Sequence, residues 1–233
     1  MARVSVIDVY FIDVNASSDI IDALAGLLAD HELARANRYR FPDDRRRSIV
    51  ARAATRRLLS RDLDADPRAL VIVEEEHGKP VLPNREIEFN ASHSGDLVAL
   101  AIAKGTPVGI DVEHRRRLSD SLALAQRYFS AEELARVRAA DDADDAFFTI
   151  WTAKESIVKA TGKGIATGDL RAFTVPVRDP QMRPVAQPRM RLVIDGWSVA
   201  SLDPPLEGYY AAVAARAGER GITSRTINPA ALL

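Results

Sequence analysis

Three acidic residues lie in two short segments whose composition could support chemistry. Asp111 and Glu113 are separated by one residue in the apolar run 107–113, and Glu155 lies in Trp151-Thr152-Ala153-Lys154-Glu155. In a strand, residues i and i+2 face the same side, so the first two carboxylates would project together. In a helix, Lys159 would lie one turn beyond Glu155 on the same face. Three converging carboxylates suit a hard divalent cation, and a neighbouring lysine suits a phosphate ligand.

The same spacing has a plainer interpretation. The pair at 111 and 113 could be solvated at the end of a strand whose other face packs in the core. Glu155 could form ordinary helix salt bridges with Lys154 and Lys159. Residue types alone therefore leave both a metal site and a solvated surface open.

A second polar segment, Phe89-Asn90-Ala91-Ser92-His93-Ser94-Gly95, combines an imidazole with hydroxyl groups. His93 could bind phosphate on a tight turn, or it could be a turn residue that backbone groups satisfy. The segment does not indicate a serine hydrolase, because Ser92, His93 and Ser94 are adjacent, whereas a triad brings separate groups together. The chain also lacks the G-x-S-x-G motif.

Two further segments, Gly78-Lys79-Pro80 and Gly162-Lys163-Gly164, place a lysine beside glycine. Neither lies in a Walker A pattern, and the chain contains no G-x-G-x-x-G motif. The arginines between 45 and 61 are interpreted mainly as a solvated helix face. One or two of them directed at an anion would be enough for phosphate binding.

The composition excludes several classes of protein. The 233 residues are 47% hydrophobic, enough for one large core or two smaller ones. The 32 basic and 33 acidic residues give a net charge of −1, which argues against bulk attraction to nucleic acid. The absence of cysteine excludes disulfides and thiolate chemistry. Because Asp8 and Asp13 interrupt the first apolar segment and no later stretch could span a bilayer, we expect a cytoplasmic protein without membrane attachment.

The elements of the first half follow from periodicity and turn residues. We expect a strand over 4–14, a helix from Ser18 to about Arg38, and an arginine-rich helix from Asp43 or Asp44 to about Asp64. The remaining strands of this part are expected over 71–75, 87–90, 97–103 and 108–113. The last two should form a β-hairpin around Lys104-Gly105-Thr106-Pro107.

The second half is expected to begin with a helix near 119–128. A capping box at Ser130 and Glu133 should start a second helix that runs to about Ala139, and a third is expected over 144–160, ended by Gly162 and Gly164. Short strands are expected over 171–177, 191–194, 197–201 and 209–214, with a surface loop over the proline-rich stretch 176–188. Both halves combine helices with short strands, without the alternation of a doubly wound sheet. We therefore expect an α+β fold of two similar-sized lobes, 1–106 and 107–233.

Five segments resemble, in the same order, the motifs of the 4′-phosphopantetheinyl transferases of the broad-specificity (Sfp) type, which activates polyketide and nonribosomal peptide synthetases. They are Gly78-Lys79-Pro80, Phe89-Asn90-Ala91-Ser92-His93-Ser94, Gly109-Ile110-Asp111-Val112-Glu113, Tyr128-Phe129-Ser130 and Trp151-Thr152-Ala153-Lys154-Glu155-Ser156-Ile157-Val158-Lys159, with Gly162-Lys163-Gly164 behind the last. Each motif is weak alone, but five in order at family-like intervals are specific. The resemblance runs from about Arg35 to the last expected strands.

The resemblance implies two pseudo-symmetric α/β lobes with coenzyme A bound between them. It implies an enzyme, a holo-[acyl-carrier-protein] synthase, in which a serine hydroxyl of an apo carrier protein attacks the β-phosphorus of coenzyme A. The carrier gains the 4′-phosphopantetheine arm, and adenosine 3′,5′-bisphosphate leaves. Because the nucleophile belongs to the partner, the chain needs no catalytic serine or cysteine of its own.

The resemblance also assigns roles to residues. Asp111, Glu113 and Glu155 match the metal positions for Mg²⁺, with Mn²⁺ as the alternative. Lys159 matches a lysine that contacts the pyrophosphate, and Glu155 matches the base, acting directly or through a metal-bound water. The residues that match coenzyme A contacts, with serine in place of threonine at position 48, are Arg35, Arg47, Ser48, Gly78, Lys79, Ser92 and His93. Glu32 occupies another position that can be basic, which leaves the 3′-phosphate contacts before Arg47 open.

The expected partners are apo acyl, peptidyl or aryl carrier domains of polyketide, nonribosomal peptide or fatty acid synthases. We expect a monomer, because two lobes already supply both sides of a cleft. The resemblance implies a carrier that presents an acidic helix, so the run Arg115-Arg116-Arg117 within 115–129 is either a carrier contact or an ordinary solvated run. Two rival functions remain: a non-catalytic coenzyme A or nucleotide-binding protein, and a metal-dependent phosphohydrolase that uses water.

Overall fold

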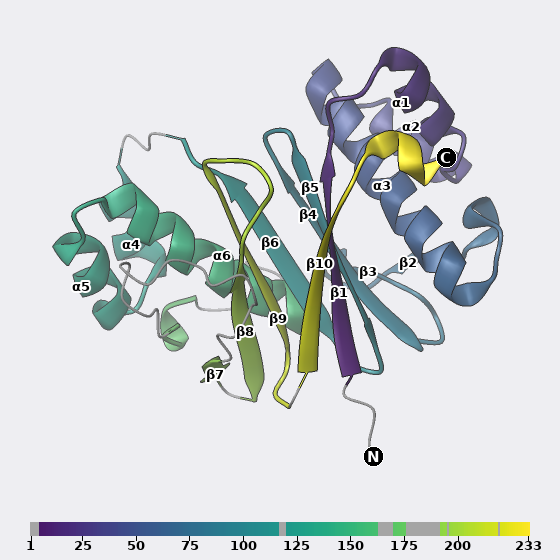
Figure 1. Cartoon of the computed structure of the whole chain (residues 1–233). Helices are drawn as coiled ribbons and strands as arrows, with labels where there is room; N and C mark the ends of the chain where they lie inside the picture. Colours follow the sequence, from purple (N-terminus) through teal and green to yellow (C-terminus); the bar gives the residue numbers. More distant parts are fainter. Residues whose placement is uncertain (1–4, 117–119, 163–169, 176–191, 195, 219) are drawn as a thin grey trace.

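The computed structural model describes residues 5–116, 120–162, 170–175, 192–194, 196–218 and 220–233. Two four-stranded sheets pack face to face, and helices cover the outer face of each, so the layers follow the order helix, sheet, sheet, helix (Figure 1). The strand orders are β10-β1-β5-β4 and β6-β9-β8-β7. This mixed architecture confirms the expected α+β class.

The first sheet contains strands from both ends of the chain: β1 (Ser5–Asp13), β4 (Ile87–Ser94), β5 (Leu97–Lys104) and β10 (Arg220–Ile227). β5 is antiparallel to both β1 and β4, whereas β10 runs parallel to β1. The helices on its outer face are α1 (Ser18–Ala25), α2 (Asp30–Ala36) and α3 (Pro42–Leu63). A short 3-10 helix and a two-stranded ribbon lie between α3 and β4: η1 (Pro67–Ala69), β2 (Val73–Glu74) and β3 (Pro80–Val81).

The second sheet is wholly antiparallel among its described residues and consists of β6 (Val108–His114), β9 (Tyr209–Arg216), β8 (Trp197–Leu202) and β7 (Leu192–Ile194). Its helices are α4 (Ser121–Tyr128), α5 (Ala131–Ala139) and α6 (Ala143–Thr161), with the 3-10 helix η2 (Leu170–Ala172) after them. Residues of α6 pack on β8 and β9 through a shared apolar cluster. The long helix α6 is therefore the outer layer on this side.

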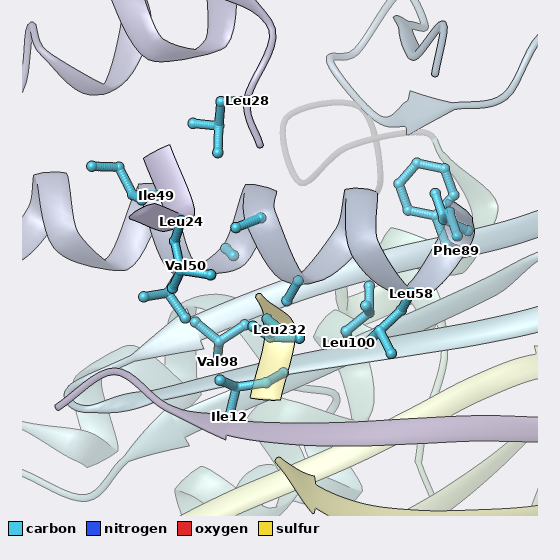
Figure 2. Close-up of a cluster of buried hydrophobic side chains, with 14 of the residues drawn as sticks. Ile12, Leu24, Leu28, Ile49, Val50, Leu58, Phe89, Val98, Leu100 and Leu232 are labelled. Atoms are coloured by element: carbon cyan, nitrogen blue, oxygen red, sulfur yellow. The ribbon is translucent and has the colours of Figure 1, made fainter. Parts of the chain in front are cut away.

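Three apolar clusters hold the layers together. Between α3 and the first sheet, side chains such as Leu58 and Leu100 meet, and Leu232 from the C-terminal 3-10 helix η3 (Pro229–Leu232) joins them (Figure 2). Between the sheets, small and β-branched residues such as Val9 and Val213 form a second cluster. The third lies under α6. Burial of these faces is the main force that fixes the relative position of the two sheets.

The C-terminal end of the chain returns to the first sheet. β10 pairs with β1 from Ser5↔Arg220 to Ile12↔Ile227, and η3 packs against the cluster below α3. The expected second lobe, 107–233, therefore contributes a strand to the first sheet. This strand was not expected from the sequence, although Ile222, Thr223, Thr226 and Ile227 are β-branched.

The prediction of one helix from Ser18 to about Arg38 is wrong, because the chain forms α1 and α2 with a break between them. Leu24 and Leu28 are both buried in the core, which turns the chain after Gly26. Ala29 is then extended, and its N–H donates to the Glu32 carboxylate (3.1 Å), so a new helix begins there. Core anchoring and the Glu32 cap thus override the helical period.

The prediction of a hairpin between 97–103 and 108–113 is also wrong. β5 pairs with β1 and β4 on its two sides, while β6 lies at the edge of the other sheet. Because both faces of β5 are apolar, it is a central strand with no free edge for β6. The hairpin that does form joins β4 to β5, and Gly95 at its turn has a left-handed φ of +53°.

Most other boundaries are close to those expected. The capping box at Ser130 and Glu133 starts α5, and Gly162 ends α6 in the left-handed conformation. The strand expected over 87–90 continues to Ser94, so Ser92 and His93 lie in a strand rather than a turn. Within 171–175 the described residues form no strand. Several expected features lie outside the described residues: the loop at 176–188 and residues Arg117, Lys163 and Gly164. None of the described helices has the length and apolar character that a membrane span requires.

Candidate active site

The β6 strand alternates between the core and the candidate site. Val108, Ile110 and Val112 are buried in the cluster between the sheets. Asp111 and Glu113 therefore lie on the opposite face, and Asp111 is bonded there by a side chain of α6. The prediction that the two carboxylates project together, with a core face behind them, is confirmed.

Gly109 lets α6 lie directly on β6. A Cβ at this position would be 2.2 Å from the carbonyl oxygen of Ser156 and 2.3 Å from the backbone nitrogen of Ala160. Any larger residue would push the helix away from the strand. Because Glu155 and Lys159 adjoin these two α6 residues, the close approach brings them to the carboxylates of β6.

The edge strands β4 and β6 meet through side chains at every second residue of β4. Three of these hydrogen bonds are Ile110 N to Asn90 Oδ1 (2.9 Å), Ser92 Oγ to Asp111 Oδ1 (2.9 Å) and Ser94 Oγ to Glu113 Oε2 (2.8 Å). Ser94 Oγ also accepts from the His114 N–H (3.0 Å). This side-chain ladder joins the two sheets along one line, and the carboxylates lie on it.

Lys159 connects α6 to this ladder. Its Nζ donates to Asp111 Oδ1 (2.6 Å) and to Ser92 Oγ (2.8 Å). The Lys159 side chain is 28% exposed, whereas that of Asp111 is 5% exposed. The ammonium therefore lies where a buried carboxylate meets solvent.

Two carboxylate oxygens of the site have no hydrogen-bond partner. Among the described residues, Asp111 Oδ2 and Glu155 Oε1 are buried and unbonded. Buried oxygen atoms of this kind are normally paired, so an unpaired one in a folded protein needs a physical explanation. A ligand with positive charge would supply the missing partner.

Burial and mutual repulsion change the protonation of the acids. Burial, and after it the charge of Asp111, raises the pKa of Glu155 to about 7, although Lys159 opposes the change. Burial also raises the pKa of Glu113, while its bond from Ser94 acts in the other direction. A carboxylate whose pKa lies near neutrality can accept a proton and release it again.

The residues fit a hard divalent cation in type rather than in finished geometry. All the candidate ligands are carboxylates, and two of their oxygens are buried without a partner. Within the described part of the chain, however, no group of three acidic or histidine side chains is already arranged to hold a metal ion. The Lys159 ammonium bonded to Asp111 is one visible reason.

His93 lies on the other face of β4, which packs toward α3 through Phe89 and Ala91. Arg47 on α3 is bonded to Gly95 O (3.0 Å) and Asp44 Oδ1 (2.6 Å). Although His93 is an exposed residue, the surrounding protein lowers its pKa by desolvation, and the charges of Arg47 and Lys159 lower it further. Both cations therefore lie near enough to the His93 imidazole to change its pKa.

The other expected contacts of the first lobe have local partners. Arg35 on α2 donates to Glu74 Oε1 (2.7 Å), and its side chain is half exposed. Glu32 is buried and accepts from Arg56 Nε (2.5 Å), so its carboxylate belongs to the framework. Ser48 is half buried beside Arg47. In the described residues, no hydrogen bond joins Arg35 or Ser48 to the carboxylates of the site.

Lys79 is placed unlike an exposed nucleotide contact. Gly78 is exposed in the turn between β2 and β3, but Lys79 is buried. Its Nζ donates to Val108 O (3.2 Å) and Ala160 O (3.1 Å), which belong to β6 and to the last turn of α6. Burial lowers the pKa of Lys79, and Glu88 and Glu75 oppose this.

Sequence reasoning gave no role to Asn90, Ser94 or Gly109, although all three shape the site. Ser94 shares the strand face of Ser92, two residues earlier, and this signal was hidden by the prediction that the strand ends at Asn90. Gly109 alternates with the apolar residues of β6 and lies two residues before the first acid. A glycine at such a point indicates close approach of another backbone.

The comparison with known families covers both halves of the chain. Residues 107–213 match the model described as the 4′-phosphopantetheinyl transferase superfamily. Residues 15–105 match the model described as 4′-phosphopantetheinyl transferase, N-terminal. The two matches meet where the chain crosses from β5 to β6.

Individual relatives agree with this result. The chain is 41% identical over 149 residues to the 4′-phosphopantetheinyl transferase HetI of Nostoc sp.. This alignment covers 61% of this chain and 63% of HetI. The chain is 38% identical over 168 residues to psf-1 of Bacillus pumilus, covering 70% of this chain and 69% of that protein. It is 29% identical over 168 residues to Sfp of Bacillus subtilis, covering 71% of this chain and 73% of that protein. Given the matches on both halves and the identity to psf-1, the chain belongs to the 4′-phosphopantetheinyl transferase superfamily.

Proposed function

We propose that this protein transfers the 4′-phosphopantetheine arm of coenzyme A to a serine of an apo carrier protein and releases adenosine 3′,5′-bisphosphate. The observation that carries the proposal is the group formed by Asp111, Glu155 and Lys159. In it, two buried carboxylate oxygens without partners lie beside an ammonium. Membership of the superfamily and the names of the relatives support the same reaction.

The metal of this reaction would be Mg²⁺, with Mn²⁺ as a substitute, held by Asp111, Glu113 and Glu155. The all-oxygen donor set and the two unpaired oxygens support this assignment. When bound, a divalent cation neutralises the pyrophosphate and the charge that develops on the leaving group. Lys159 would bind a pyrophosphate oxygen from the side of α6.

The 3′-phosphate would lie between β4 and the start of α3. His93 and Arg47 come to this region from two elements. Desolvation, and after it the charges of Arg47 and Lys159, lowers the pKa of His93. Ser48 and Arg35 would lie at its border, and the exposed turn at Gly78 would contact the nucleotide. Ser92 would act nearer the pyrophosphate, because it bonds Asp111 and Lys159.

Glu155 would accept the proton of the carrier serine. It is buried, its Oε1 has no hydrogen-bond partner in the described part of the chain, and its pKa of about 7 allows a fraction of ionised carboxylate at neutral pH. The hydroxyl oxygen then forms its bond to the β-phosphorus as the bond to the leaving phosphate breaks. Dry surroundings favour attack by a bound serine over attack by water.

The partners would be acyl, peptidyl or aryl carrier domains of polyketide, nonribosomal peptide or fatty acid synthases. A carrier that presents an acidic helix could meet Arg116, which is exposed. Arg116 lies close enough to Glu113 for its charge to oppose the rise in the pKa of that acid. We further propose that the protein acts as a monomer in the cytoplasm.

One experiment separates the proposed transfer from its two rivals. Purified protein is incubated with coenzyme A and Mg²⁺, with and without an apo carrier domain, and release of adenosine 3′,5′-bisphosphate is followed by chromatography. A transferase releases the bisphosphate only with the carrier. Release of the bisphosphate without carrier would indicate a phosphohydrolase. No release in either case would indicate a non-catalytic binding protein.

A further inference from the structure

We propose that Lys159 is the internal counter-ion of Asp111 and competes with the divalent cation for this carboxylate. Metal binding and coenzyme A binding are then coupled, because each helps to move Lys159 from Asp111 to the pyrophosphate. The inference rests on the proposed function and deepens it. It concerns what this chain does at the metal position before coenzyme A binds.

The geometry of Asp111 supports the competition. Oδ1 accepts from Lys159 Nζ (2.6 Å) and from Ser92 Oγ (2.9 Å), whereas the buried Oδ2 has no hydrogen-bond partner among the described residues. A cation that approached Oδ2 would come within a few Å of the ammonium. Two positive charges at such a distance in a partly buried site repel each other strongly.

Lys159 is held in place on the Asp111 side. Ser92 Oγ accepts from its Nζ (2.8 Å), so two of the three ammonium donors point at the β4–β6 ladder. The absence of a finished three-carboxylate arrangement among the described residues agrees with this placement. Before coenzyme A binds, the Lys159 ammonium is therefore the positive charge that Asp111 contacts.

Coenzyme A supplies the alternative partner for Lys159. Its pyrophosphate carries charge that attracts an ammonium, and the 28% exposed side chain of Lys159 can turn toward solvent. Once the ammonium has moved, Asp111 Oδ1 becomes free for the metal. Linkage requires that the effect is mutual, so the metal must strengthen coenzyme A binding by the same factor.

A different role for Lys159 predicts the opposite result. If the ammonium only holds Asp111 in a rotamer that suits the metal, its removal would weaken metal binding. If it competes, its removal should strengthen metal binding in the protein without coenzyme A. The sign of one change in affinity therefore decides between the two.

The test measures Mn²⁺ binding by electron paramagnetic resonance, without any turnover. Lys159→Met should bind Mn²⁺ at least ~10-fold more tightly than wild type in the absence of coenzyme A, as expected for removal of a like charge a few Å away. Lys159→Gln, a second neutral variant, should behave in the same way. Lys159→Arg keeps the charge and should show no gain. Lys104→Met, at an exposed lysine of β5, is the matched control and should equal wild type.

The second part of the experiment repeats the Mn²⁺ titrations in the presence of coenzyme A. Coenzyme A should strengthen Mn²⁺ binding by a larger factor in wild type than in Lys159→Met, because the variant has no ammonium to displace. Equal or weaker Mn²⁺ binding in both neutral variants would overturn the competition while leaving the metal site in place. If neither wild type nor any variant binds Mn²⁺, with or without coenzyme A, the proposed metal site itself fails.

Discussion

At the scale of single residues, the site concentrates negative charge where water is scarce. Asp111 and Glu155 are both buried, and the charge of Asp111 is, after burial, a cause of the raised pKa of Glu155. Lys159 offsets this charge only in part. The ionised form of Glu155 therefore destabilises the fold, so the group that we propose as the base works against stability.

Glu155→Gln should stabilise the protein at alkaline pH. With a folded pKa of about 7 and an ordinary value of 4.5, native Glu155 keeps a proton that the unfolded chain has lost, so the stability from this group falls as pH rises from 4.5 to about 7. At pH 8 the variant should gain up to about 3 kcal/mol in urea unfolding, and almost nothing near pH 4. Glu76→Gln, at an exposed position, is the control. A variant less stable than wild type at pH 8 would contradict the raised pKa.

His93→Ala should weaken coenzyme A binding by ~10–100-fold, as expected for loss of a charge-assisted hydrogen bond. Dephospho-coenzyme A should be affected far less, because it lacks the 3′-phosphate. The pKa of His93 is lowered in the free protein, and a phosphate would raise it. Calorimetry should therefore show proton uptake on binding, with affinity that rises as pH falls. An equal loss for both ligands would remove His93 from the 3′-phosphate site.

At the scale of elements, the site depends on the contact between α6 and β6. The sequence predicted both the alternation of apolar and acidic residues on β6 and the long helical segment of α6. The length of β4 was not, because Ser92, His93 and Ser94 are typical of turns and their strand conformation depends on pairing with β5 from Ser92↔Ala99 to Ser94↔Leu97. Pairing with β5 therefore outweighs the preference of these residues for turns.

Lys79→Met tests the contact between α6 and β6 at the point where Lys79 bonds both elements. Its buried ammonium bonds Val108 O and Ala160 O, so the variant leaves two carbonyls without this donor. We expect a loss of about 1–3 kcal/mol in urea unfolding, whereas Lys104→Met should stay within about 0.5 kcal/mol of wild type. Turnover should fall with the shift of α6. Unchanged stability, with a rise only in the coenzyme A dissociation constant, would instead make Lys79 a plain nucleotide contact.

At the scale of the whole molecule, the site lies where edge strands of two sheets meet (Figure 1). The sequence indicated two similar-sized α+β lobes but not that their edges join through Asn90, Ser92 and Ser94. Nor did it indicate that β10 completes the first sheet beside β1. Both features are pairings between residues distant along the chain, which local periodicity cannot report.

Arg116→Glu should slow association with an acidic carrier. Arg115 is bonded to Asp142 (2.5 Å), so Arg116 is the better test among the described arginines of this run. We expect the carrier Michaelis constant to rise by ~10-fold at low salt, with the difference fading above roughly 0.1 M salt as screening sets in. Coenzyme A affinity should not change. Arg225→Glu on β10 is the exposed control, and equal effects of the two reversals would leave Arg116 as ordinary surface.

Intact-mass spectrometry of an apo carrier domain tests the proposed transfer at this site most directly. With coenzyme A and Mg²⁺, wild type and the control Asp96→Asn, at an exposed acid of the β4–β5 turn, should each add one phosphopantetheine arm to the carrier serine. Asp111→Asn removes charge at the buried carboxylate and should slow this addition by at least ~100-fold, as expected when a major electrostatic contact of the transition state is lost. A carrier whose mass stays unchanged with wild type, or that is modified equally fast by Asp111→Asn, would contradict the proposal.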